Sequence, residues 1–258
     1  MYDLFSSDYD RFVNWANRLE GELPFIEDLV ARTGTRSGDR PVVLDAACGT
    51  GMHAVALAKR GFRTVGADLS SGMIGRANDN AREAGVDVRF ETAGFGSLAQ
   101  TFGGANFDVV LCLGNSLPHL LSPIDLNLAL VDFANCLRPG GLLLIQNRNF
   151  DAVLANHERW MEPQSHREDE REWLFLRFYD FKPEGLINFN VVTLARKAGG
   201  AWSQRVSSSL LYPLREGEIL QGLNTAGFQM AERFGNLAGA PFSAQSSGNL
   251  VVAAYRSE

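Results

Sequence analysis

The sequence predicts an α/β protein with a doubly wound, mostly parallel seven-stranded sheet and an inserted antiparallel β meander. Short apolar runs alternate with amphipathic helical patterns from Pro41 to about residue 150. A β-rich stretch follows, and after it come one more helical pattern and two strand patterns. Because strands that alternate with helices form parallel sheets covered on both faces, we expect five strands from the first stretch and two from the last.

Residues 1–40 are expected to form a helical cap in front of this sheet. Apolar residues recur at loosely helical intervals between Tyr9 and Thr33, and Pro24 interrupts the pattern. Since proline removes a backbone donor from a helix interior, the pattern predicts two helices on either side of Pro24.

The first repeating unit begins at Pro41. "PVVLDAA" is typical of a buried strand, and "GMHAVALAKRG" is an amphipathic helix that Gly61 ends. "FRTVGADL" predicts the second strand. "SSGMIGRANDNAREAG" predicts a helix with Ser70 or Ser71 as N-cap and Gly85 as its C-terminal stop. "VDVRFE" predicts the third strand.

The remaining core elements follow the same alternation. "FDVVLCLG" predicts a fourth strand, "SPIDLNLALVDFANCLRPGG" a helix closed by Pro139-Gly140-Gly141, and "LLLIQN" a fifth strand. Residues 151–213 then read as an antiparallel β insertion, a lid or interface, whose segments are separated by KPEG and KAGGAW. "REGEILQGLNTAGF", "FQMAERFG" and "GNLVVAAYR" complete a core formed by residues 41–150 and 214–258.

The composition favours a small-molecule substrate. The 258 residues are 45% apolar with a formal net charge of −6, which argues against a nucleic-acid partner. Cys48, Cys112 and Cys136 lack CxxC spacing and are expected to be buried thiols in a reducing compartment. The four histidines show no metal-ligand spacing. No stretch approaches the roughly 18 apolar residues of a membrane span, so we expect no membrane partner and a cytoplasmic location.

Two glycines and two acidic residues indicate a ligand site at the strand ends. Gly49 and Gly51 lie in the turn after the first strand, where positive φ angles let a ligand lie against the main chain. Asp45, four residues before Gly49, can accept hydrogen bonds from an amine-bearing ligand. Asp68 ends the second strand and can hold both ribose hydroxyls of a nucleoside. As an alternative, Asp68 is an N-cap for the helix from Ser71.

"LDAACGTG", "VGADLS", "FDVVLCLGNSLPHL" and "LRPGGLLLI" resemble the successive motifs of class I S-adenosylmethionine-dependent methyltransferases, over about residues 41–147. The resemblance implies a Rossmann-like fold and S-adenosylmethionine as cofactor. By that resemblance the Gly49–Gly51 turn approaches the methionine part of the cofactor, Asp68 holds the ribose, and Asp45 faces the methionine amino group.

The same resemblance implies an adenine site. Leu69 and Met73 would pack on the adenine, and Phe95 would cover it. This chain has Gly94-Phe95 after the third strand where the family carries Asn-Trp, which alters the covering contact. Tyr2, Tyr9 and Arg18 approximate the N-terminal aromatic and arginine positions that close over cofactor and substrate. Further cofactor contacts are implied for Ala47, Leu113, Asn115 and His119.

A narrower resemblance points to the acceptor. "CLGNSLPHL", "QNRNFDAVL" and "DYDRFVNWANR" are similar to segments of the glycine N-methyltransferase and glycine/sarcosine methyltransferase family. The resemblance implies that Asn115 and Arg148 bind the substrate, that Arg148 pairs with an amino-acid carboxylate, and that Tyr212 lies near the substrate. Residues 155–205 match that family only in general shape.

Each of these positions also has a purely structural interpretation. Arg148 follows a strand end and offers a planar fork for a carboxylate, but it could equally form a surface ion pair with Asp151. Asn115 could be a turn residue, His119 an ordinary residue in the first turn of a helix, and Tyr212 a packing residue at a strand end.

The hypothesis is therefore methyl transfer to a small carboxylate-bearing amine, such as the amine of glycine or sarcosine. Methylation of a sugar amine or natural-product intermediate is the first alternative. A non-catalytic S-adenosylmethionine-binding or interaction protein that works through the meander of residues 165–213 is the second. A nicotinamide-dependent oxidoreductase is disfavoured by the AACGTG turn, although Ala54 in place of the third glycine does not by itself exclude a dinucleotide. A homo-oligomer remains open.

Overall fold

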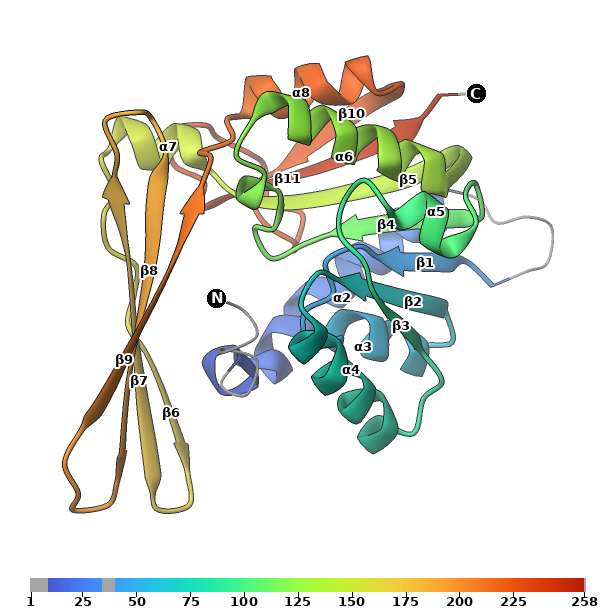
Figure 1. Ribbon diagram of the computed structural model, residues 1–258. Helices are drawn as coiled ribbons and strands as arrows, with labels where there is room; N and C mark the ends of the chain where they lie inside the picture. Colours follow the sequence, from blue (N-terminus) through green and yellow to red (C-terminus); the bar gives the residue numbers. More distant parts are fainter. Residues whose placement is uncertain (1–8, 34–39, 258) are drawn as a thin grey trace.

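The computed structural model describes residues 9–33 and 40–257 as two β-sheets with helices around the larger one (Figure 1). The larger sheet has seven strands: β1 (Val42–Asp45), β2 (Arg63–Asp68), β3 (Arg89–Thr92), β4 (Phe107–Cys112), β5 (Leu137–Arg148), β10 (Phe228–Phe234) and β11 (Asn249–Arg256). Their order is β10-β11-β5-β4-β1-β2-β3. Only β11 runs against its neighbours, so the sheet is mostly parallel and the predicted fold class is confirmed.

Helices cover both faces of this sheet (Figure 1). One face carries α2 (Trp15–Arg32), α3 (Met52–Lys59) and α4 (Ser71–Ala84). The other carries α5 (Leu98–Phe102), α6 (Pro123–Cys136) and α8 (Glu216–Thr225). Separate apolar clusters fill the space on each face, and β4 is buried along its whole length between them. This double burial explains the continuous apolar run "FDVVLCLG".

The N-terminal segment differs from the prediction at Pro24. Helix α2 continues through Pro24, and the break falls at Asn14, whose side chain accepts a hydrogen bond from the Asn17 N–H. A short helical stretch, residues 9–12, precedes the break. Pro24 is exposed, so the carbonyl that loses its helical partner faces water, while Ile26 and other apolar residues of α2 stay buried against the sheet.

The end of α6 also differs from the prediction. The helix ends at Cys136 and β5 begins at the next residue, so Pro139-Gly140-Gly141 lies inside the strand. Leu137 pairs with Phe107 before the turn, and the register between β4 and β5 shifts there. The turn is therefore an irregularity in the strand, as proline and glycine in a strand often indicate.

The inserted region forms the second sheet, whose four antiparallel strands are β6 (Gln164–Glu168), β7 (Arg171–Phe181), β8 (Ile187–Lys197) and β9 (Ser203–Leu211). The sequence indicated the last three strands, and β6 is additional. Helix α7 (Phe150–Ala155) joins this sheet to the core: Phe150 packs with Tyr179 and Ile187 in one buried cluster. The four-stranded sheet projects from the core beyond the ends of the parallel strands (Figure 1).

Residues 9–12 lie between the two sheets. Tyr9 and Phe12 pack against a buried cluster on the four-stranded sheet that includes Trp173 and Phe175. The rings of Phe12 and Phe175 meet edge to face at 5.4 Å. In Figure 1 this short helix lies between the four-stranded sheet and the helices below the seven-stranded sheet.

The structure bears on three sequence expectations, which concern the cysteines, membrane spans and metal sites. All three cysteines are buried and free. Within residues 9–33 and 40–257, no helix has the length and apolarity needed to cross a bilayer. The same residues contain no group of three histidine, cysteine or acidic side chains placed to hold a metal ion.

Gly51 owes its missing side chain to core packing. Its φ is +77°, and a Cβ there would lie 2.7 Å from the Phe90 ring and 2.9 Å from the Ala77 Cβ. Both neighbours belong to the buried contact between α4 and β3. The sequence suggested that a bound ligand excludes a side chain at this position. Packing against Phe90 and Ala77 is already sufficient to exclude one.

We expect Gly51→Ala to lower the free energy of unfolding by about 2–4 kcal/mol, from backbone strain and overpacking. Gly75→Ala is the matched control, because Gly75 is exposed in α4 with nothing near its absent Cβ. That change should raise stability by about 0.5–1 kcal/mol. Urea unfolding monitored by circular dichroism measures both, and a Gly51→Ala protein as stable as the unmodified one would contradict the packing account.

Candidate functional site

The predicted site residues meet at one edge of the seven-stranded sheet. Asp45, Asp68 and Arg148 end β1, β2 and β5, and Asn115 follows β4. The carboxyl ends of parallel strands form the ligand crevice in sheets of this topology. The four-stranded sheet and residues 9–12 lie beyond the same edge (Figure 1).

Asp68 connects the glycine turn to the end of β2. One carboxylate oxygen accepts a hydrogen bond from the Gly49 N–H at 2.9 Å, and the other accepts one from the Ser70 N–H at 2.9 Å. The N-cap alternative for Asp68 is wrong, because the Ser70 hydroxyl caps α4 by accepting from the Met73 N–H. Asp68 therefore faces the turn after β1.

Asp45 is a buried carboxylate with an unsatisfied oxygen. Its side chain is 2% exposed, and its Oδ2 has no hydrogen-bond partner among the described residues. Burial and the nearby Asp68 raise its pKa to about 7, while the Ala47 N–H and Arg18 favour the charged form. Buried polar atoms are normally paired, so an unpaired oxygen here fits an ammonium-bearing ligand. The residues present thus fit an amino-acid nucleoside such as S-adenosylmethionine.

Tyr9 lies over the glycine turn. Its ring carbon Cε1 is 3.7 Å from the place of a Cβ on Gly49, whose φ is +53°. Burial raises the pKa of Tyr9, and the charges of Asp68 and Asp45 act in the same direction. The ring is therefore close to both carboxylates, where the sequence predicted an aromatic cover. Tyr2, also predicted there, lies outside the described residues.

Asp10 fastens residues 9–12 to the glycine turn and to α4. Its carboxylate accepts hydrogen bonds from the Thr50 hydroxyl at 2.6 Å, Trp15 Nε1 at 3.1 Å and Arg76 Nε at 2.9 Å. The Asn80 amide nitrogen donates to the Asp10 carboxylate and to the Thr50 carbonyl. The sequence analysis missed Asp10, because its partners other than Trp15 lie 40 or more residues away.

Arg18 belongs to a polar network that crosses three elements. Its Nε donates to Glu22 at 3.0 Å and its Nη2 to Gln146 at 3.5 Å. The same Gln146 oxygen accepts from the Gly114 N–H, which fixes the turn after β4. Glu22 also lies 2.7 Å from Nε2 of the buried His53. Arg18 is thereby held beside the predicted cofactor turn.

The predicted adenine residues show three different environments. Leu69 is 79% exposed, and its Cδ1 lies 3.1 Å from the place of a Cβ on Gly94. Phe95 packs edge to face against Phe133 at 5.3 Å. Met73 is buried. An exposed leucine against a bare glycine suits a flat apolar ligand, whereas Phe95 as a cover stays a prediction.

Asp132 of α6 orders the loop that follows Gly94. Its buried carboxylate accepts hydrogen bonds from the backbone N–H groups of Gly96, Leu98 and Ala99 at 2.8–3.0 Å. These donors would otherwise be unpaired at the start of α5. The sequence analysis missed Asp132, because it lies among the apolar residues of α6 and gives no local signal.

Asn115 is both a turn residue and a link to Arg148. Its φ is +66°, a left-handed conformation that asparagine tolerates better than most residues. Its side-chain oxygen accepts from the Arg148 N–H at 2.8 Å, and its own N–H donates to the Gln146 carbonyl. The Asn115 amide nitrogen has no partner among the described residues. The structure thus brings Asn115 and Arg148 together, as predicted.

Arg148 pairs with Glu158 and keeps one donor unused. Its Nη2 donates to Glu158 at 2.6 Å, while its buried Nε has no partner among the described residues. The predicted alternative, an ion pair with Asp151, is wrong, since Asp151 accepts from the Glu216 N–H. A guanidinium with one buried unused donor can still bind a carboxylate.

Tyr212, His119 and Leu113 lie around the turn after β4. The Tyr212 hydroxyl donates to Glu218 at 2.6 Å, and its backbone N–H donates to the Pro118 carbonyl. Burial lowers the pKa of His119 to about 4, so its imidazole is neutral at physiological pH. Leu113 is buried in the core. Their roles at the site stay predictions.

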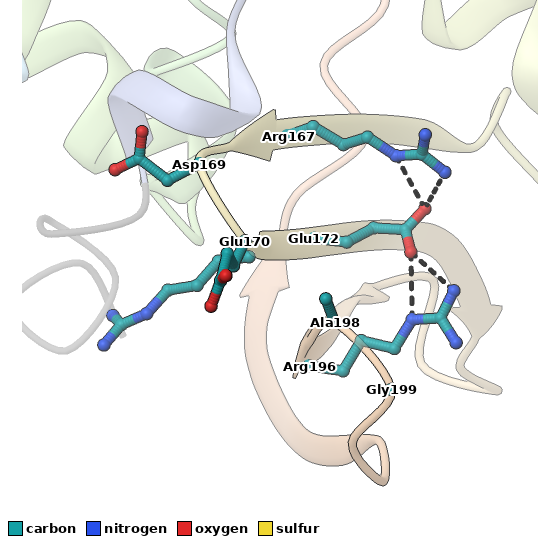
Figure 2. Close-up of a pocket in the computed structure, with 8 residues that line it drawn as sticks. Arg167, Asp169, Glu170, Glu172, Arg196, Ala198 and Gly199 are labelled. Atoms are coloured by element: carbon teal, nitrogen blue, oxygen red, sulfur yellow. Dashed lines mark hydrogen bonds and ion pairs between the residues drawn. The ribbon is translucent and has the colours of Figure 1, made fainter.

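A hollow of about 330 Å³ lies beside the turns that join β6 to β7 and β8 to β9 (Figure 2). Figure 2 shows the Glu172 carboxylate between Arg167 and Arg196, which both donate to it. These three charges satisfy one another, and no predicted site residue lines the hollow. We therefore assign no methyl-transfer role to it.

Comparisons with known proteins agree with the geometry of the sheet edge. A family profile described as "Methyltransferase domain" matches residues 43–141. The chain is 30% identical over 242 residues to a glycine/sarcosine N-methyltransferase of Parasynechococcus marenigrum, covering 90% of this chain and 77% of that relative. The chain belongs to the S-adenosylmethionine-dependent methyltransferases. It belongs to the same family as the Parasynechococcus marenigrum relative.

Other similarities extend the comparison. The methyltransferase is 36% identical over 153 residues to a glycine/sarcosine N-methyltransferase of Halorhodospira halochloris, covering 59% of this chain and 54% of that relative. A solved S-adenosylmethionine-dependent methyltransferase of Clostridium acetobutylicum superimposes with a TM-score of 0.78 at 17% identity, over 100% of this chain and 99% of that one. The amino pentose methyltransferase CalS10 of Micromonospora echinaspora, solved with S-adenosylmethionine, gives 0.69 at 20% identity over 98% and 97%. The cofactor of the methyltransferase is S-adenosylmethionine.

We expect Asp68→Asn to weaken binding of S-adenosylhomocysteine at least tenfold. The amide has a single acceptor oxygen, so it cannot serve the Gly49 and Ser70 N–H groups while holding a ribose, and charged hydrogen bonds contribute about 1.5–3 kcal/mol each. Isothermal titration calorimetry measures the affinity. Asp79→Asn is the control, because this partly exposed carboxylate of α4 pairs with Arg82. Equal affinity of the Asp68→Asn and unmodified proteins would contradict the ribose role.

The raised pKa of Asp45 predicts pH-dependent cofactor binding. An ammonium ligand needs the charged carboxylate, so affinity should rise about tenfold between pH 6 and pH 8 and binding should release about half a proton at pH 7. A carboxyl pKa raised in the folded state means that the ligand-free protein loses stability as pH rises from about 4 through about 7. Calorimetry in buffers of different ionisation enthalpy counts the released protons. An identical pH dependence in Asp45→Asn would refute the assignment.

Proposed function

We propose that the methyltransferase transfers a methyl group from S-adenosylmethionine to the amine of an amino acid such as glycine or sarcosine. The observation that carries the proposal is the guanidinium of Arg148, which ends β5 at the same sheet edge as the cofactor turn and keeps a buried, unused Nε donor. The names of the relatives that are 30–36% identical support it. The three buried free thiols are compatible with a cytoplasmic enzyme.

The cofactor is assigned to the turn after β1. Asp68 holds the ribose hydroxyls, Asp45 accepts from the methionine amino group, and Gly49 lets the main chain lie close to the ligand. Tyr9 and Arg18 close the turn from outside. The remaining proposed contacts are Ala47, Gly51, Leu69, Met73, Gly94, Phe95, Leu113, Asn115 and His119.

The acceptor is assigned to the space between that turn and the end of β5. Arg148 binds the carboxylate, and the free amide nitrogen of Asn115 helps to orient the acceptor. The Asn115 side chain accepts a hydrogen bond from the Arg148 backbone N–H, which holds the two residues next to each other. The cofactor supplies a reactive methyl group on a sulfonium, so the chain's task is alignment and exclusion of water. Tyr212 is proposed near the acceptor through the Pro118 turn, with its hydroxyl held by Glu218.

The guanidinium also argues against the alternatives. A neutral sugar amine offers no carboxylate to Arg148 and would leave a buried donor unpaired, which costs about 1–3 kcal/mol. A non-catalytic cofactor-binding protein has no use for an acceptor group at the crevice. The amino-acid acceptor therefore accounts for more of the site than either alternative.

Labelled S-adenosylmethionine offered with glycine, sarcosine, dimethylglycine and an aminosugar tests the proposal. We expect label transfer to glycine or sarcosine and none to the aminosugar. We further expect Arg148→Gln to raise KM for the amino acid at least tenfold, a loss of about 1.4 kcal/mol, with little change in cofactor affinity.

Arg159→Gln is the matched control, because this half-exposed arginine pairs with Asp180 on the four-stranded sheet. Its KM should equal that of the unmodified enzyme. Transfer to the aminosugar alone, or an unchanged KM in Arg148→Gln, would overturn the amino-acid assignment.

A further inference from the structure

An arginine interrupts an apolar row on the four-stranded sheet. Side chains of β7 alternate between its two faces, so Trp173, Phe175, Arg177, Tyr179 and Phe181 share one face. Trp173, Phe175 and Tyr179 are buried, and the row packs against residues 9–12 and α7. A charge within such a row is costly to bury, so its retention calls for a specific interaction.

Arg177 has no acidic partner in the part of the chain that the structure describes. Its Nε is buried without a hydrogen bond, and its guanidinium lies 4.7 Å from the centre of the Phe12 ring. Stacking on an aromatic ring holds a guanidinium in place but satisfies none of its donors. The positively charged Arg177 side chain is therefore held in place and still has unused hydrogen-bond donors.

Arg177 lies close enough to Arg148 for their charges to interact. Residues 159–161 pair with β7 at Arg177 and Tyr179, through the Met161 N–H and the Tyr179 N–H. This pairing places Glu158, the partner of Arg148, directly beside that part of β7. Burial lowers the pKa of Arg177 and the charge of Arg148 lowers it further. Burial raises the pKa of Tyr179 to about 12, although the positive charges of Arg148 and Arg177 lower it.

The charges in this space do not balance. Arg148 and Arg177 carry two positive charges, and Glu158 supplies one negative charge. Two partly buried guanidinium groups repel each other, and one additional carboxylate between them would offset the repulsion and use both unpaired Nε donors. Ser209 of β9 lies on the same face, opposite Phe189 and thus in line with Tyr179, and its buried hydroxyl is also unpaired among the described residues.

We propose that Arg177 and Arg148 together bind the carboxylate of the acceptor, so that the four-stranded sheet supplies one half of a two-guanidinium subsite. This inference rests on the proposed function and deepens it. The core alone holds the cofactor and Arg148, and the sheet adds the residue that selects acceptors with a single negative charge. The Arg177 guanidinium stacks on the Phe12 ring. The subsite is therefore complete only when residues 9–12 lie over the cofactor turn.

Acetate, a carboxylate without an amine, tests the subsite without turnover. It is titrated by calorimetry, at constant ionic strength, into the complex of the enzyme with S-adenosylhomocysteine. We expect Arg177→Met and Arg177→Gln to weaken acetate binding at least tenfold and to raise KM for sarcosine at least tenfold, with S-adenosylhomocysteine affinity unchanged. Arg171→Met is the control, because it removes the same charge from an exposed end of the same strand and should change neither quantity.

The outcomes separate this inference from the proposed function. Unchanged acetate affinity in both Arg177 variants overturns the subsite, as does a complete lack of acetate binding to the unmodified enzyme. If Arg177→Met fails to fold, Arg177→Gln decides, with thermal unfolding as the check. If acetate binding depends on Arg177 while no amino acid is methylated, the subsite is supported and the amino-acid assignment alone fails.

Discussion

The carboxylate of Asp68 is the contact on which the rest of the site depends. It joins the turn after β1 to the start of the segment after β2 through two backbone N–H groups, at Gly49 and Ser70. This arrangement holds Gly49 at a positive φ and directs Asp68 toward the place where a ribose would lie. It also brings Asp68 close to the buried Asp45, and their mutual repulsion adds to the burial that raises the pKa of Asp45. A cationic amino group beside Asp45 would relieve that repulsion, which is why the pair suits a ligand with a diol and an ammonium group.

Residues 9–12 convert this cofactor turn into part of a larger enclosed site. Asp10 is bonded to the core through Thr50 and Arg76, whereas Arg11 reaches Glu168 and Phe12 packs on Phe175 of the four-stranded sheet. Consecutive residues of one short helix therefore hold both sheets. Unpaired buried atoms of Asp45, Arg148, Arg177 and Ser209 belong to strands of the same two sheets. Native interiors leave few polar atoms unpaired, and such atoms concentrate where a protein binds its ligands.

The sequence was sufficient for features that depend on local chemistry. Alternating periodicities predicted the parallel sheet and the antiparallel insertion, and Ser70 and Gly85 do begin and end α4 as expected. Features that depend on distant partners could not be read in advance. Apart from the Trp15 contact, the hydrogen bonds of Asp10 and Asp132 span 33 to 70 residues, and the clash that keeps Gly51 bare comes from Phe90. The predicted break at Pro24 was wrong, because water at this exposed face of α2 can replace the lost backbone hydrogen bond. Arg177 did leave a signal, a single basic residue in the alternating aromatic run "WLFLRFYDF".

The most direct measurement is a crystal structure of the enzyme with S-adenosylhomocysteine and sarcosine bound. The account predicts the ribose hydroxyls on Asp68 and the sarcosine carboxylate within hydrogen-bonding distance of both Arg148 and Arg177. A ribose bound away from Asp68, or a carboxylate that contacts neither guanidinium, would contradict it.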